Sequence, residues 1–191
     1  MPALADAYLA GGARFLQIRC KHAASGAFLD MCEDVVARAR MAGATVIVND
    51  RADVAKLSAA DGVHVGQDDL DPASARRILG GAAIVGMSTH SADQVRAAAG
   101  MAVDYIAVGP IFGTSTKDTG YRGVGTAFVS EAVVILRRAD CATPIVAIGG
   151  ITLERAPEVM EAGAASVAVI SDLLSTGDPE ARVREYLRAL S

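Results

Sequence analysis

The sequence predicts a parallel α/β fold, a (β/α)8 barrel of the TIM type that lacks its first β-strand at the N-terminus. Three observations over the 191 residues lead to this prediction. Short apolar runs recur along the chain, helical segments that end near a glycine precede most of them, and polar residues follow each run. Continuous apolar runs are typical of strands that helices cover on both faces. Strands that alternate with helices in turn favour a parallel sheet.

Seven apolar runs rich in Val, Ile and Ala are the predicted strands. Gly43 stands just before the run TVIVN, and Gly163 before SVAVIS. Glycine ends a helix at little steric cost, because it readily adopts the left-handed conformation. The strands are expected at about 13–18, 44–48, 61–65, 82–87, 103–108, 144–149 and 165–170.

The chain begins with a predicted helix, residues 3–10, and then continues with the first apolar run. A barrel without its first strand would begin in this way, and a doubly wound open sheet is the alternative. An open sheet concentrates ligands at one switch point, whereas here polar residues follow every predicted strand, as in the C-terminal loops of a barrel. Further helices are expected at 27–41, 91–99, 127–138, 153–162 and 179–189, and residues 1–191 are expected to form one domain.

Composition and charge argue against several classes of protein. Apolar residues make up 52% of the chain, and the net charge of −4 disfavours a general nucleic-acid or membrane-surface binder. The three cysteines, Cys20, Cys32 and Cys141, are too far apart in sequence to suggest a zinc site. No signal peptide is recognisable, and no apolar run reaches the length of about 18 residues that suggests a membrane span. We therefore expect a cytoplasmic protein with reduced thiols.

Gln17, Arg19 and Lys21 lie at the end of the first predicted strand, in the segment QIRCK. Because side chains alternate along an extended chain, the three should project to the same side and could bind a phosphate. A solvated strand end explains the spacing equally well. Cys20 should point the other way, so we do not expect it to be catalytic.

Asp50 and Asp69 follow the second and third predicted strands. Two carboxylates at neighbouring strand ends could share Mg²⁺, which usually takes one or two protein carboxylates together with water and phosphate oxygens. Asp50 could instead cap the next helix, just as Asp71 is expected to cap a helix that begins with proline. His64 lies inside a strand, where a lone histidine is more often a satisfied core residue than a ligand.

Later loops combine hydroxyl groups with glycines. Ser88 lies in GMSTH, where either Ser88 or the nearby Ser91 could simply cap the following helix. The loop GPIFGTSTK is either a polar turn or an anion site. The Gly149–Gly150 pair would let backbone N–H groups approach an anion, although such pairs also mark ordinary turns. Loops after the last two strands often bind phosphate in barrels of this type, which draws attention to Ser171.

Taken together, these segments resemble the thiamine-phosphate synthase family, which includes the TenI thiazole tautomerases. The resemblance extends over residues 13 to 172 and rests on the ordered set QIRCK, VNDR, DGVHVGQDDL, GMSTH, GPIFGTSTK, IVAIGGIT and VAVIS. It implies a (β/α)8 barrel that joins 4-amino-2-methyl-5-hydroxymethylpyrimidine diphosphate to a thiazole phosphate. The products would be thiamine phosphate and pyrophosphate.

The resemblance also implies a role for each matching residue. Binding of the pyrimidine diphosphate is implied for Gln17, Arg19, Lys21, Asn49, Ser88 and Lys117, of which Arg19, Lys21 and Lys117 would be catalytic. Binding of the thiazole phosphate is implied for Thr114, Thr116, Gly150, Ile170 and Ser171. Asp50 and Asp69 would bind Mg²⁺ as the cofactor. Such a reaction needs no enzyme nucleophile, since fixed cations and Mg²⁺ stabilise the leaving pyrophosphate.

Two features depart from the family pattern. Cys20 stands where the family usually has glutamate, and the absent first strand would expose the edges of the strands at 13–18 and 165–170. An upstream segment, a swapped segment or the partner in a homodimer could cover those edges. The expected partners are the two small-molecule substrates, with no nucleic acid and no membrane.

Three other functions stay open. A TenI-like tautomerase would need an acid–base group rather than diphosphate ligands, and a non-catalytic barrel could bind a thiamine precursor. An unrelated phosphate-binding barrel isomerase would share the Gly149–Gly150 and Ser171 loops but not the pair of aspartates. The cations and carboxylates named above favour the synthase.

Overall fold

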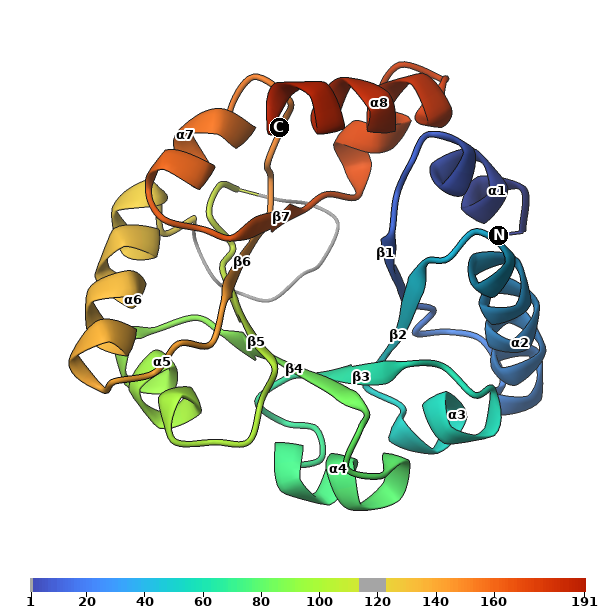
Figure 1. The fold of residues 1–191 in the computed structure, drawn as a ribbon, viewed down its shortest axis with the longest axis horizontal. Helices are drawn as coiled ribbons and strands as arrows, with labels where there is room; N and C mark the ends of the chain where they lie inside the picture. The colour runs from blue at the N-terminus through green and yellow to red at the C-terminus, as the bar shows by residue number, and fades with distance from the viewer. Residues whose placement is uncertain (1, 114–122) are drawn as a thin grey trace.

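A curled sheet of parallel strands surrounded by helices forms the fold (Figure 1). The computed structural model describes residues 2–113 and 123–191. Within them the sheet has seven strands, which pair in sequence order. They are β1 (Phe15–Ile18), β2 (Thr45–Asn49), β3 (Gly62–Val65), β4 (Ile84–Thr89), β5 (Tyr105–Val108), β6 (Ile145–Ile148) and β7 (Ser166–Ala168). The predicted barrel-type α/β fold with one strand fewer is confirmed.

The helices lie on the outer side of the curled sheet (Figure 1). They are α1 (Pro2–Ala10), α2 (Ser25–Met41), α3 (Ala52–Leu57), α4 (Pro72–Leu79), α5 (Ala92–Ala99), α6 (Thr126–Arg138), α7 (Ala156–Glu161) and α8 (Pro179–Ala189), with a 3-10 helix, η1 (Ser171–Leu174), before α8. None of the helices in the described part of the chain is both long and apolar enough to cross a membrane.

The central strands are buried on both faces, as their continuous apolar sequences predict. Every residue of β3 and of β5 is buried, and Val63, Val65 and Ile106 are fully enclosed. The outward face packs against the helices, while the inward face fills the barrel. Apolar burial on both sides is therefore the main stabilising contribution to this sheet.

The two outer strands, β1 and β7, pair on one side only among the described residues. Phe15 at the start of β1 is 52% exposed, in contrast to the buried residues of the central strands. β7 is also shorter than expected. It ends at Ala168, and Ile170 lies beyond it, directly before η1. β5, which pairs on both sides, is likewise shorter than its predicted range of 103–108, so the predicted bounds are too long in the centre of the sheet as well as at its edges.

Helix starts follow the local capping chemistry. Asp71 caps α4 as predicted, because its carboxylate accepts a hydrogen bond from Ser74 N at 3.0 Å. The suggested cap role of Asp50 is wrong, since Arg51 occupies the N-cap position of α3. The helix expected at 153–162 begins only at Ala156, consistent with Pro157, which has no N–H and fits the first turn.

Candidate active site

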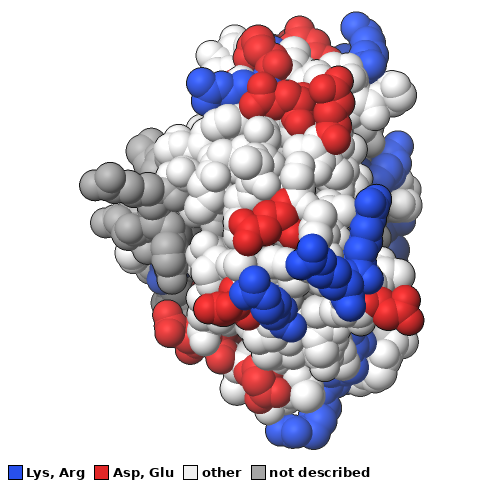
Figure 2. All heavy atoms as spheres, turned by 90° about the vertical axis from the view of Figure 1, so that its left-hand side faces the viewer, with Lys and Arg blue, Asp and Glu red and all other residues white. Residues whose placement is uncertain are grey.

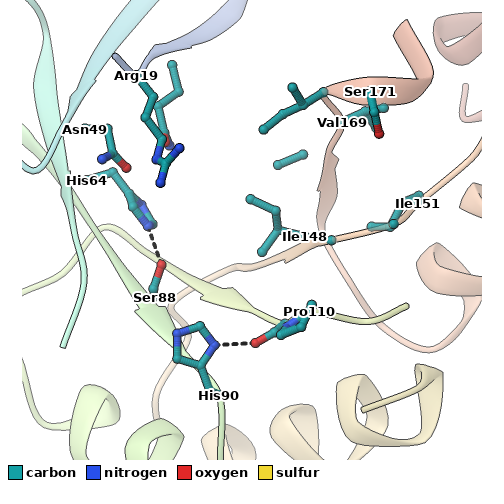
Figure 3. A pocket seen from close by; sticks show the side chains of 16 residues that line it. Arg19, Asn49, His64, Ser88, His90, Pro110, Ile148, Ile151, Val169 and Ser171 are labelled. Carbon is teal, nitrogen blue, oxygen red and sulfur yellow. Dashed lines mark hydrogen bonds between the residues drawn. The ribbon is translucent and has the colours of Figure 1, made fainter. Parts of the chain in front are cut away.

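A pocket opens at the C-terminal ends of the strands, and all seven strands or the loops after them contribute to its wall (Figure 3). One side comes from the first half of the chain and is polar. The other side comes from the second half and combines glycines with apolar side chains. The lining residues are Gln17, Arg19, Asn49, His64, Ser88, His90, Gly109, Pro110, Ile148, Gly149, Gly150, Ile151, Ala168, Val169, Ile170 and Ser171.

Arg19 is the cation that the structure places in the pocket. Its buried Nε has no hydrogen-bond partner among the described residues, and the rest of its guanidinium makes no ion pair with them. Arg76 also has an unpartnered buried Nε, but its terminal nitrogen pairs with Asp104 Oδ2 at 2.7 Å. A buried polar atom without a partner is costly unless a ligand satisfies it, so Arg19 Nε indicates that the pocket binds an acceptor group, and the charge of Arg19 favours an anion.

The outer face of the molecule differs from the pocket in the distribution of its charged side chains. The side that bears α6 and α7 shows acidic and basic side chains dispersed among neutral ones (Figure 2). Exposed charges such as these are largely screened by salt at separations beyond about 10 Å. Among the described residues, the unshared positive charge of Arg19 is instead held inside the barrel mouth.

Other sequence-predicted residues enter the pocket beside Arg19. Gln17 is two residues earlier on β1 and shares its inward side, as the alternation rule predicts. Asn49 at the end of β2 is only 8% exposed, and Ser88 on β4 is equally buried. Cys20 packs against the hydrophobic core instead, in agreement with its expected outward direction.

Lys21, Asp50 and Asp69 are not among the lining residues. Lys21 is exposed in the turn after β1, and Asp69 is exposed on the loop after β3. Asp50 directly follows β2, the neighbour of β3, and adopts a left-handed backbone with φ 65°. Asp69 Oδ2 accepts a hydrogen bond from Gly66 N at 2.7 Å, which leaves its second oxygen for another partner.

The carboxylates of Asp50 and Asp69 fit a magnesium site in chemistry. Both are hard oxygen donors on loops after adjacent strands. No group of three or more His, Cys, Asp or Glu side chains forms a metal cage in the part of the chain that the structure describes. Magnesium does not require such a cage, because water and substrate phosphate oxygens usually complete its coordination.

The opposite wall is built around the Gly149–Gly150 pair. Both residues have positive φ, 101° and 64° respectively. A Cβ on Gly149 would lie 2.6 Å from Pro110 Cβ, and one on Gly150 would lie 2.6 Å from Gly113 O. Only glycine therefore fits this turn. The turn and Ser171, which begins η1, both line the pocket, where backbone N–H groups can receive an anion.

Thr114, Thr116 and Lys117 lie outside the described residues. The described segments before and after these residues form backbone hydrogen bonds close to the Gly149–Gly150 pair. Phe112 N donates to Gly149 O at 2.9 Å, and Val124 N donates to Pro110 O at 2.9 Å. The described residues on both sides of this stretch therefore lie at the pocket wall.

Two groups of side chains at the site were not predicted from the sequence. His64 was expected to be a satisfied core residue, and it is buried, but it also lines the pocket and hydrogen-bonds Tyr105 and Ser88. A second group, Asp172, Arg182 and Tyr186, lies just behind Ser171. The sequence offered two signals for these groups, namely a tyrosine within an apolar run and an aspartate directly after a pocket serine. Neither signal is specific, because both also occur in ordinary cores and loops.

Comparison with known proteins extends the resemblance over nearly the whole chain. A sequence profile of the family described as thiamine monophosphate synthase matches residues 1–173. A thiamine-phosphate synthase from Chlorobium luteolum is 40% identical over 96% of this chain and 84% of its own length. One from Anaeromyxobacter dehalogenans is 43% identical over 94% of this chain and 78% of its own length. A solved structure of thiamine phosphate pyrophosphorylase from Pyrococcus furiosus superimposes with a TM-score of 0.88 at 28% identity, covering 100% of this chain and 91% of that chain.

Proposed function

Because the chain belongs to the thiamine monophosphate synthase family, we propose that it joins an aminopyrimidine diphosphate to a thiazole phosphate. The aminopyrimidine substrate is 4-amino-2-methyl-5-hydroxymethylpyrimidine diphosphate. The bond between its methylene carbon and the diphosphate oxygen breaks, and the electron pair leaves with pyrophosphate. The thiazole nitrogen then donates its lone pair to the methylene carbon, which forms the new C–N bond of thiamine phosphate.

The division of the pocket into two unlike sides is the observation that carries the proposal. The unpartnered Arg19 guanidinium stands on the β1 side, and Ile148, Ile151 and Ser171 stand on the other (Figure 3). The Gly149–Gly150 turn lies between Ile148 and Ile151 in the sequence and also lines the pocket. Two substrates that each carry phosphate need two anion sites within reach of each other. Binding both in one site replaces a bimolecular encounter with a unimolecular step.

The residue types in the wall support a reaction driven by leaving-group stabilisation. Among the described lining residues there is no carboxylate and no cysteine that could act as a nucleophile. Arg19 offers fixed positive charge and hydrogen-bond donors to the departing pyrophosphate, and Asn49 beside it can orient the same group. Ile148, Ile151 and Val169 exclude water from the opposite side, which protects a reactive cation from hydrolysis.

The roles of Asp50, Asp69, Lys21 and Lys117 belong to the same proposal. Asp50 and Asp69 would hold Mg²⁺, which when bound supplies additional positive charge to the diphosphate. Lys21 and Lys117 would supply further positive charge to the diphosphate. With Gln17, Ser88, Thr114, Thr116, Gly150, Ile170 and Ser171, they make up the proposed substrate site.

A reconstituted reaction tests this function. The purified protein is incubated with both substrates and Mg²⁺, and thiamine phosphate is measured by chromatography together with released pyrophosphate. We expect equal molar amounts of the two products. If both substrates bind but neither product appears, a non-catalytic binding role replaces the synthase. Conversion of a thiazole carboxylate phosphate alone would instead indicate the tautomerase.

A further inference from the structure

The loop after β3, residues 66–71, carries Asp69 and is held in place by two hydrogen bonds near its start. Gly66 N donates to Asp69 Oδ2 at 2.7 Å, so the carboxylate folds back over the loop. Gln67 Nε2 donates to the backbone oxygen of Ser88 on β4 at 2.6 Å. Because a carbonyl oxygen can only accept, the glutamine side chain must be the donor. The loop is thereby attached to a strand 21 residues further along the chain.

Asp50 is attached to the end of the same strand, β3. Its backbone N–H donates to His64 O at 2.8 Å, and Arg51 N donates to Asn49 O at 2.8 Å across a tight turn. Asp50 lies at the centre of this turn with φ 65°, a conformation that is uncommon outside glycine and persists where the surrounding structure holds it. Since β2, β3 and β4 lie side by side (Figure 1), the main chains of Asp50 and of the Asp69 loop meet at one strand end.

The Asp69 loop has few other restraints. Residues 67–71 are all exposed, and Asp71 at the end of the loop is engaged with α4 through Ser74 N. Among the described residues, the Gln67 bond is the one side-chain hydrogen bond that joins this loop to a neighbouring strand. Without it, an exposed segment of this length would gain conformational freedom, and binding a ligand would then have to remove that freedom again.

We propose that Gln67 is a positioning residue whose bond to Ser88 O holds the loop in the conformation in which Asp69 binds a divalent cation together with a diphosphate. Gln67 does not line the pocket, so it acts through Asp69 and not through contact with a substrate. The inference rests on the metal-binding part of the proposed function and adds to it the residue that orders the ligand loop. Groups that hold a metal ligand in place contribute to metal affinity although they do not touch the metal.

The effect of Mg²⁺ on pyrophosphate binding tests the inference without turnover. Calorimetry gives the affinity for inorganic pyrophosphate with saturating Mg²⁺ and, separately, with EDTA. We expect the wild-type protein to bind pyrophosphate at least about tenfold more tightly with Mg²⁺. In Gln67→Met, which keeps the length of the side chain but has no donor, this gain should fall by about fivefold. Binding in EDTA should stay within about twofold of wild type, because the variant leaves Arg19 in place.

Gln94→Met is the matched control. The Gln94 side chain also bonds the backbone just beyond β4, since its Oε1 accepts from His90 N at 2.6 Å, but it has no link to the Asp69 loop. Both variants lose one side-chain bond of the same length, so their melting temperatures should fall by similar amounts. Only Gln67→Met should lose the gain from Mg²⁺. Because Gln67 is exposed, this variant should fold.

The outcomes separate this inference from the proposed function. An undiminished gain from Mg²⁺ in Gln67→Met would overturn the positioning role, even in a working synthase. Equal weakening with Mg²⁺ and with EDTA, or the same loss in Gln94→Met, would overturn it too, because either pattern shows a general effect on the rim of the barrel. Failure to synthesise thiamine phosphate while the Gln67 effect is present would overturn the function and leave the inference standing.

Discussion

The Tyr186 hydroxyl on α8 donates to Asp172 Oδ2 across a distance of 2.7 Å, and this contact ties the last helix to the pocket loop. Arg182 joins the same carboxylate through its Nε at 3.1 Å and a terminal nitrogen at 2.9 Å. The backbone N–H of Leu153 also points to Asp172 Oδ2, at 3.3 Å. Asp172 directly follows Ser171, so these bonds hold together the two loops that form the glycine-rich side of the pocket.

Tyr186→Phe should weaken this link without removing the ring. Loss of one hydrogen bond to a carboxylate is expected to lower the free energy of unfolding by about 1–2 kcal/mol. The KM for the thiazole phosphate should rise severalfold, while the KM for the pyrimidine diphosphate should stay constant. Urea denaturation and steady-state kinetics measure the two effects. An equal rise in both KM values would show that the contact acts on the whole pocket.

Gly150→Ala should abolish most of the activity because the new methyl group has no room. Its Cβ would lie 2.6 Å from Gly113 O in a backbone with φ 64°. Gly177→Ala is a matched control, since Gly177 has a similar φ of 78° but no atom within 4 Å of the added Cβ. Both variants carry the left-handed cost of about 1 kcal/mol, and only Gly150→Ala adds the clash. Melting temperatures and rates that match between the two variants would contradict a tight turn.

Arg19→Gln should separate activity from stability. The guanidinium has no partner among the described residues, so its removal should change the free energy of unfolding by no more than about 0.5 kcal/mol. Turnover should fall by about a hundredfold, because a fixed charge on the leaving group is lost. Arg137→Gln on the exposed face of α6 should change neither quantity. A rate within twofold of wild type would rule out contact between Arg19 and the diphosphate.

Asp69→Asn tests the metal site with a side chain of nearly the same shape. The amide oxygen can still accept the hydrogen bond from Gly66 N, so the turn should persist while one negative charge is removed. We expect chelation to stop wild-type turnover, added Mg²⁺ to restore it, and the variant to need at least about tenfold more Mg²⁺ for half-maximal rate. Asp71→Asn on the same loop should behave as wild type, because asparagine is an equally good helix cap. An unchanged Mg²⁺ titration for Asp69→Asn would place the metal elsewhere.

The Tyr105 hydroxyl predicts a loss of stability at alkaline pH. Burial raises its pKa in the folded protein above the ordinary value of 10.0. Above that pH the unfolded chain loses the tyrosine proton while the folded protein keeps it, so stability that is fully present below pH 10 declines as the pH rises. Urea denaturation from pH 8 to pH 11 should therefore show a smaller decline for Tyr105→Phe than for wild type. Parallel declines would mean that Tyr105 ionises equally in both states.

The order of the elements, and the end of the sheet at which chemistry-bearing residues gather, could be predicted from the amino-acid sequence. Apolar runs buried on both faces require covering helices, and parallel strands bring their C-terminal ends to one rim, so Gln17, Arg19, Asn49 and Ser88 were correctly expected near one another. Asp71 was also recognisable, because a helix cap is a local interaction. The roles of these side chains toward substrates, and those of Thr114, Thr116 and Lys117, stay predictions.

Which residues meet across the sheet could be seen only in the folded protein. Tyr105 reaches His64 because an intervening strand has Gly86 in register, and Asp172 meets Tyr186 because α8 packs behind η1. Neither pair has a local sequence signal, since the partners are 41 and 14 residues apart. Such relationships depend on register and packing between distant segments, which local periodicity does not encode.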